Sequence, residues 1–173
     1  MRVWVIDTGA IVEIRRGLPT IVRGRVLRML DARVNDGSLI FPPEVVDELQ
    51  RMTDEISKKG VDLPYDWAKR HEEQATRFGR LFDGAKAVIK KCPSLVDHRK
   101  VSIHGVDDAD PYVIALAIEV ARQGHEVTII TEDVNTKPTK MALADAAGVF
   151  MVPAVRFRTF LMTEDIWDGV EGT

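Results

Sequence analysis

Four acidic residues stand where an apolar run gives way to a helix-start signal, although they are spread widely along the chain. They are Asp7, Glu48, Asp110 and Asp133. In a parallel sheet the carboxyl ends of neighbouring strands share one edge, so acids that follow such strands converge in space. Two carboxylates about 4 Å apart repel by roughly 4 kcal/mol at an effective dielectric constant near 20, so their cluster requires protons or a cation. The pattern therefore predicts one metal site at a sheet edge.

The donor atoms indicate which metal this site would prefer. Carboxylate oxygens favour Mg²⁺ or Mn²⁺ over zinc. Cys92, His98 and His104 lie near one another in the sequence, but their spacing does not fit a zinc site. Hard cations held by carboxylates typically act on phosphate groups, so we expect a substrate that contains phosphate.

Three of these acids also have a simpler structural explanation. Asp7 could cap a helix through residues 11–14, and Asp110 could cap the helix that Pro111 begins. Asp133 could be a turn residue after a strand. Capping gives no reason for these acids to converge on one sheet edge, which favours the metal site.

Glu48 is the least distinctive of the four acids. It shares a helical face with Glu44, Arg51 and Glu55, and such a stripe is also typical of a solvated helix surface. Glu44 or Asp47 could take the place of Glu48 at the site, so the identity of the second ligand stays open.

The elements that would position the acids follow from apolar runs and turn residues. Residues 3–6 and 127–130 are short, unalternating and rich in β-branched side chains, which is typical of strands covered on both faces. Further strands are predicted at residues 39–41 and 149–152, and helices at 18–34, from Pro42-Pro43, at 113–121 and at 140–147. This order predicts a three-layer α/β/α sandwich with a short, mainly parallel central sheet. We expect residues 1–173 to form a single domain with a helical insertion at about 54–91.

Length and cysteine content narrow the class of protein. A chain of 173 residues has the size of one domain and can bury a substantial core. The single Cys92 excludes an internal disulfide, and Asp7 interrupts the apolar start too early for a secretory leader or a membrane span. We therefore expect a cytoplasmic protein without membrane contact.

The charge is unevenly distributed along the chain. The net charge is -3, which argues against a protein that coats nucleic acid by bulk positive potential. Residues 51–100 carry 12 basic and 8 acidic side chains, whereas residues 101–173 carry 5 and 12. We expect the basic segment, and in it Lys58, Lys59, Lys90 and Lys91, to face a polyanion beside the acidic centre; ordinary solvated helix faces are the alternative.

Large apolar side chains gather near the end of the chain. Phe157, Phe160, Leu161 and Trp167 lie where a small domain has little core left to cover them. Exposed patches of this kind mark protein contacts, so we expect a partner surface here. The alternative is that they cover the last edge of the sheet.

The segments around the acids resemble, in order, the four signature segments of PIN domains. They are Ile6-Asp7-Thr8, Asp47-Glu48-Leu49, Asp110-Pro111-Tyr112-Val113-Ile114-Ala115-Leu116-Ala117 and Thr131-Glu132-Asp133. The resemblance extends from residue 3 to about residue 155. Lys137-Pro138-Thr139-Lys140, with a helix and Gly148-Val149 after it, further resembles a PIN-like subfamily often labelled a domain of unknown function. Proteins near that subfamily are commonly toxins of toxin-antitoxin pairs.

The resemblance implies a metal-dependent endoribonuclease. Asp7, Glu48, Asp110 and Asp133 would hold one or two Mg²⁺ or Mn²⁺ ions, and Thr8 and Thr131 would orient carboxylates or the attacking water. The implied partners are an RNA substrate and a cognate antitoxin, with a homodimer as the free form. The antitoxin would bind the C-terminal apolar surface or the helical layer and block the acidic cleft. Gly9 departs from the many PIN domains that have Ser or Asn at this position.

Two other functions compete with this interpretation. A phosphatase of the haloacid dehalogenase type also begins with a strand-end Asp, but it requires a second acid where this chain has Gly9. A non-catalytic PIN-like binding module would use the acids as helix caps. Metal binding separates the module from the nuclease, because a bound ligand stabilises the folded state by mass action.

Overall fold

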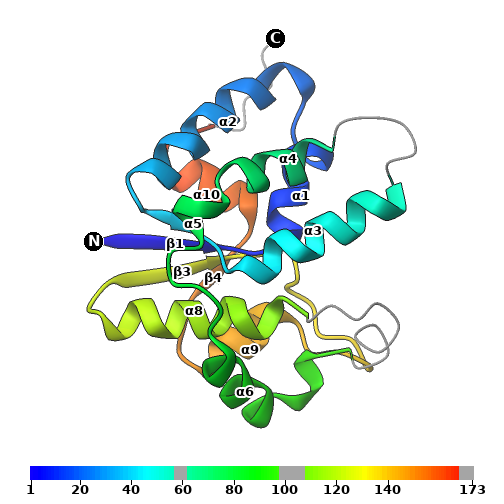
Figure 1. Cartoon of the computed structure of the whole chain (residues 1–173), viewed down its shortest axis with the longest axis vertical. Coiled ribbons are helices and arrows are strands. Elements are labelled where there is room, and N and C mark those ends of the chain that lie inside the picture. The colour runs from blue at the N-terminus through cyan, green and yellow to red at the C-terminus, as the bar shows by residue number, and fades with distance from the viewer. Residues whose placement is uncertain (57–61, 98–107, 168–173) are drawn as a thin grey trace.

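A four-stranded parallel sheet forms the centre of the molecule (Figure 1). The computed structural model describes residues 1–56, 62–97 and 108–167, with the backbone alone at 54–56. The strands are β1 (Arg2–Ile6), β2 (Leu39–Ile40), β3 (Glu126–Ile130) and β4 (Ala154–Val155), in the order β2-β1-β3-β4. The helices are α1 (Thr8–Arg16), α2 (Thr20–Asn35), α3 (Pro43–Ile56), α4 (Leu63–Arg70), α5 (Glu72–Ala75), α6 (Phe82–Lys91), the 3₁₀ helix η1 (Pro93–Leu95), α8 (Asp110–Arg122), α9 (Leu143–Val149) and α10 (Phe157–Thr163).

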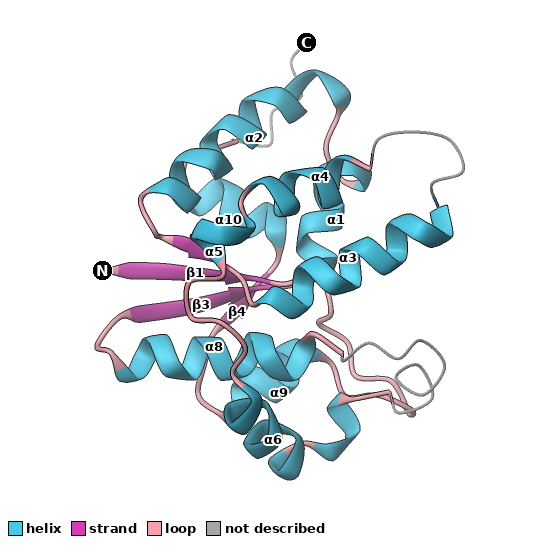
Figure 2. Cartoon of the chain, viewed as in Figure 1, coloured by secondary structure: helices cyan, strands magenta, loops and turns pink. Residues whose placement is uncertain are grey.

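Helices cover both faces of this sheet. Figure 2 shows the strands between one layer that contains α1, α2 and α10 and another that contains α6, α8 and α9. Helix α8 is apolar almost all round, and residues 111–117 are all buried against the sheet and α6. The predicted three-layer α/β/α sandwich is therefore confirmed, and every strand pairing in it is parallel.

The register of the strands places two site residues side by side. Ile6 of β1 is paired with Ile130 of β3, so the two strands end level. The Asp7 amide donates to the Ile130 carbonyl at 3.0 Å, which extends the pairing by one step. Asp7 and Thr131 therefore leave the sheet as neighbours, on the side toward which β1 runs in Figure 1 and where α8 begins.

The helical segment after α3 packs on both layers. Helix α4 contacts α1 and α3, whereas α6 contacts α8. A Cβ atom on Gly84 would lie 3.0 Å from the Cβ of Ala115, so the missing side chain lets α6 and α8 approach closely. Among the described residues, no helix is both long and apolar enough to cross a membrane.

The predicted strand at residues 149–152 is wrong. Val149 is the last residue of α9, and the chain then turns through Met151 at a φ of 59°. The Val152 amide donates to the Ala147 carbonyl at 3.1 Å, which ties this segment to the helix instead of the sheet. Strand β4 follows Pro153, whose carbonyl accepts from Ile129 at 2.9 Å. Helix α9 itself begins at Leu143, three residues later than predicted.

The C-terminal apolar residues belong to the core, so the expected partner surface is also wrong there. Phe157, Phe160 and Leu161 are at most 2% exposed, and Trp167 is partly buried. Phe160 packs edge-to-face on Trp4 of β1 with ring centroids 5.0 Å apart. These side chains are therefore core residues, and Phe160 packs on a central strand of the sheet instead of its last edge.

Candidate active site

One cleft of about 300 Å³ at the carboxyl ends of the strands contains all four predicted acids. They come from the loop after β1, the middle of α3, the start of α8 and the loop after β3. The lining residues are Asp7, Thr8, Gly9, Glu48, Met52, Asp110, Asp133, Asn135, Lys137 and Lys140. The structure thus brings together side chains that are far apart in the sequence.

Asp7 caps a helix and lines the cleft at the same time. Its Oδ1 accepts from the backbone amides of Gly9 and Ala10 at the start of α1, and its Oδ2 accepts from the Thr131 hydroxyl. Burial raises the pKa of Asp7 to about 7; the nearby Glu48 charge adds to the rise, whereas the Thr131 hydrogen bond opposes it. The capping explanation and the site explanation therefore both apply to this residue.

Glu48 is the acid that α3 directs into the cleft. Its Oε2 accepts from the Thr8 hydroxyl, and Arg51 lies 3.4 Å from its other oxygen. Glu44 and Asp47 instead hold the Arg80 guanidinium, at 2.9 and 2.6 Å, outside the cleft lining. Burial raises the pKa of Glu48. Of the three acids considered for this position, Glu48 is the one that lines the cleft.

Asp110 lies inside α8 and does not cap it, which corrects the prediction of an N-cap acid. The cap position is Ala109, and the Asp110 amide donates to the Asp108 carboxylate at 3.1 Å. Burial raises the pKa of Asp110 well above its usual value, and the charges of Asp108 and Asp7 raise it further. The Asp110 carboxylate lines the cleft and makes no hydrogen bond that caps the helix.

Asp133 is positioned by Thr131 and by the start of α9. The Asp133 amide donates to the Thr131 hydroxyl oxygen at 3.0 Å, and the Asp133 carboxylate accepts from the Leu143 amide at 3.2 Å. Thr131, which is fully buried, thus contacts two of the acids. This arrangement fixes both carboxylates at adjacent strand ends.

Lys140 is the site residue that sequence reasoning missed. Its ammonium lies 2.6 Å from Asp110 Oδ2 and 3.6 Å from Asp133 Oδ2. These charges raise the pKa of Lys140 although burial opposes the rise. The Lys137-Pro138-Thr139-Lys140 segment was recognisable as a motif, but nothing in its spacing shows that its second lysine reaches the acids.

The donor atoms of the cleft suit a hard cation, although the described side chains do not surround a single point as metal ligands do. Among the side chains that the structure describes, no group of three or more His, Cys, Asp and Glu is arranged to hold a metal ion. The donors are carboxylate and hydroxyl oxygens, which suit Mg²⁺ or Mn²⁺, and an ammonium already lies between two of them. His98 and His104 lie outside the described residues, as do Lys58 and Lys59.

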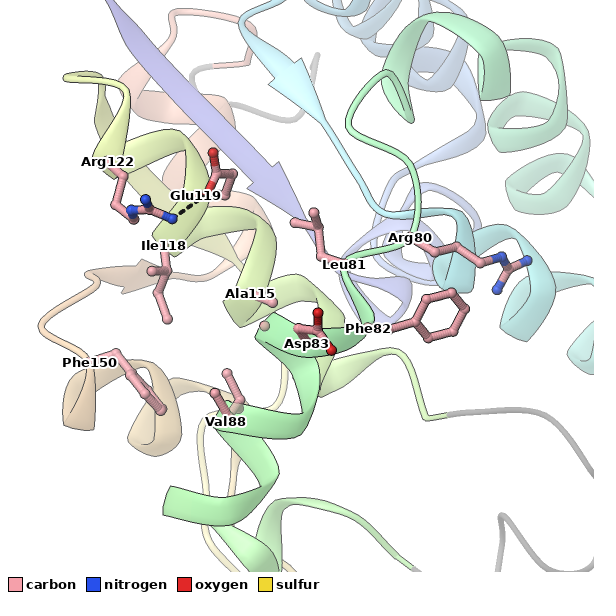
Figure 3. A pocket seen from close by; sticks show the side chains of 12 residues that line it. Arg80, Leu81, Phe82, Asp83, Val88, Ala115, Ile118, Glu119, Arg122 and Phe150 are labelled. Atoms are coloured by element: carbon pink, nitrogen blue, oxygen red, sulfur yellow. Dashed lines mark hydrogen bonds and ion pairs between the residues drawn. The ribbon is translucent and has the colours of Figure 1, made fainter.

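A second cavity, of about 400 Å³, has a different chemistry. It lies between α6, α8 and Phe150, with Leu81, Val88 and Ile118 among its apolar lining residues (Figure 3). Its Glu119 and Arg122 form an ion pair at 3.0 Å. Because none of the four acids lines this cavity, the acidic cleft is the better candidate for catalysis.

The fold and the cleft define an α/β protein with acids gathered at the carboxyl end of a parallel sheet. Residues 4–167 match the family described as "Domain of unknown function (DUF4411)", and the chain belongs to this family. No curated protein and no solved structure matches the chain.

Proposed function

We propose that this chain is a PIN-like endoribonuclease that hydrolyses RNA phosphodiester bonds with the help of Mg²⁺ or Mn²⁺. The observation that carries the proposal is the convergence of acids from four separate segments in one cleft. Helix capping accounts for Asp7 and contributes to the placement of Asp133. It does not account for Glu48 in the middle of α3 or for Asp110 inside α8.

The chain's own residues would hold and orient the acids during the reaction. Asp7, Glu48, Asp110 and Asp133 would provide the oxygen ligands, and the hydroxyls of Thr131 and Thr8 fix Asp7 and Glu48. A bound divalent cation would lower the pKa of the attacking water and neutralise charge on the phosphate. In the hydrolysis, the water oxygen bonds to phosphorus, one P–O ester bond breaks, and the leaving oxygen takes up a proton.

Electrostatics also favours a cation in this cleft. Five acids, the four predicted ones and Asp108, lie in or beside it, and such a surface alone repels a polyanion. A divalent cation offsets part of this negative charge and gives the phosphate a partner. RNA binding at the cleft should therefore depend on the cation.

The direct test is cleavage of labelled single-stranded RNA by the purified chain in EDTA, in Mg²⁺ and in Mn²⁺. We expect cleavage with either cation and none in EDTA. Single-stranded DNA of the same sequence serves as the control substrate. Equal cleavage in EDTA, or intact RNA in all three conditions, would contradict the proposal.

We further propose that the chain acts as the toxin of a toxin-antitoxin pair, with a homodimer as the free form. This part is supported by the sequence resemblance alone, because Phe157, Phe160 and Leu161 are buried in the core and offer no partner surface. Expression of the chain without its neighbouring gene should arrest growth, whereas Asp110→Asn should not. Normal growth with wild-type chain, or a monomer at all concentrations in light scattering, would count against it.

The second candidate function is a non-catalytic binding module. The contact of Lys140 with Asp110 and Asp133 favours it, because a lysine that compensates the acids removes part of the need for a metal. A melting temperature that stays constant up to millimolar Mn²⁺ would support the module, because a bound ligand would raise it.

A further inference from the structure

Hydrogen bonds hold the turn that carries Lys140, which lines the cleft. The backbones of Lys137 and Lys140 exchange two hydrogen bonds, of 2.9 and 3.2 Å. On the far side of Lys140, the Met141 amide donates to the Ser94 carbonyl at 2.8 Å, and the Ala142 amide donates to the Thr136 hydroxyl at 2.9 Å. The backbone at residue 140 is therefore anchored on both sides, and the freedom that remains belongs to the lysine side chain.

The Lys140 ammonium lies where a cation held by both Asp110 and Asp133 would have to bind. It contacts one carboxylate from α8 and one from the loop after β3, at 2.6 and 3.6 Å. These two acids belong to the set that the proposed function assigns to the metal. An ammonium and a divalent cation cannot occupy the same space beside Asp110 Oδ2, and their charges repel at short range.

The Lys140 side chain is also partly open to solvent, so it can move out of the cleft. It is 28% exposed, so it lies at the mouth and not beneath the acids. A lysine has four flexible methylene carbons and a strongly hydrated ammonium, so movement into water restores hydration that the ion pair had removed.

We propose that Lys140 is a tethered counter-ion that stands in for the divalent cation between Asp110 and Asp133 and leaves these carboxylates when the cation binds. The inference rests on the metal site of the proposed function. It gives Lys140 a role in setting cation affinity: the metal must displace an internal competitor. It also accounts for acids that gather in one cleft without closing around a single point.

The first test uses the wild-type chain and the reactivity of its lysines. A brief acetylation pulse followed by mass spectrometry measures how accessible each amine is, with and without saturating Mn²⁺. We expect Mn²⁺ to increase the acetylation rate of Lys140 about fivefold or more, because an ammonium held by carboxylates is protected. Lys90, exposed at the end of α6, is the internal reference and should not change. An unchanged or slower rate at Lys140 would overturn the inference.

The second test compares two variants by calorimetric titration with Mn²⁺. Lys140→Met removes the competing charge and keeps the apolar stem, so we expect it to bind Mn²⁺ about tenfold more tightly than wild type. Lys86→Met is the control, because it removes the same charge from an exposed position on α6 that does not line the cleft. Solvent screens that charge, so its effect should stay below about threefold.

The outcomes separate this inference from the proposed function. Equal Mn²⁺ affinity in wild type and Lys140→Met, or equal gains in both variants, would overturn the counter-ion role even if RNA is cleaved. Release of Lys140 by Mn²⁺ without any RNA cleavage would support the counter-ion and refute the nuclease. Absence of Mn²⁺ binding to wild-type chain would refute both. If Lys140→Met does not fold, the acetylation experiment on the wild-type protein alone decides whether Lys140 leaves the carboxylates when Mn²⁺ binds.

Discussion

The replacement Asp7→Asn should make the cation-free protein more stable at neutral pH. Asn keeps the size of the side chain and an oxygen that can accept from the amides of Gly9 and Ala10, so the cap on α1 persists. What the replacement removes is a carboxyl group whose ionisation the folded state disfavours. Its pKa is about 7 in the folded chain, against 3.8 as the ordinary value.

The sign and size of this effect follow from proton linkage. The folded state raises the pKa of the Asp7 carboxyl group and therefore favours its protonated form. The stability that this group contributes is fully present below about pH 4 and is lost as the pH rises through about 7. A difference of about three pKa units corresponds to at most about 4 kcal/mol. The free energy of unfolding of the wild type should therefore fall relative to Asp7→Asn between these pH values.

Urea denaturation in EDTA at about pH 4, 5.5, 7 and 8 measures this difference. We expect the two proteins to be similar in stability near pH 4 and the variant to be more stable at pH 8. Added Mn²⁺ should stabilise the wild type and leave the variant nearly unchanged. Parallel pH profiles for the two proteins would refute the argument, because the burial of the Asp7 carboxyl would then carry no energetic cost.

Two further predictions concern stability. Thr131→Val keeps the shape of a fully buried side chain but removes the hydroxyl that contacts Asp7 and Asp133, so it should cost about 1.5–3 kcal/mol and weaken Mn²⁺ binding in calorimetry; stability equal to the wild type would contradict the assigned contacts. Phe160→Ala should cost about 3–5 kcal/mol in the free energy of unfolding, because Phe160 is fully buried against Trp4. Met162→Ala, at a side chain 51% exposed in the same helix, should change it by less than about 0.5 kcal/mol, and equal losses would argue against a core role for Phe160.

The sheet and the gathering of the acids could be predicted because they depend on local patterns. Continuous apolar runs at β1, β3 and α8 are typical of elements buried on both sides, and acids after parallel strands share an edge. These two rules require no knowledge of the packing. They were sufficient to place Asp7 and Asp133 in one cleft, whereas Asp110 joins them because α8 begins at the same end of the sheet.

The errors arise where long-range packing decides between local alternatives. The apolar segment at residues 149–152 has the composition of a strand, but the turn at Met151 and the bond from Val152 to Ala147 join it to α9. Phe160 is apolar in either environment, so only its packing on Trp4 identifies it as core. The reach of Lys140 to Asp110 likewise depends on how the turn at residues 137–140 folds over the cleft.

The central claim is that the carboxylates of the cleft support metal-dependent cleavage of RNA, and Asp110→Asn tests it most directly. Asn has nearly the shape of Asp, and Asp110 does not cap its helix, so the variant should fold. The measurement is the rate of single-stranded RNA cleavage by wild type and variant at saturating Mn²⁺, with circular dichroism to verify folding. The account predicts cleavage by the wild type and none by the folded variant. Full activity of Asp110→Asn would contradict it.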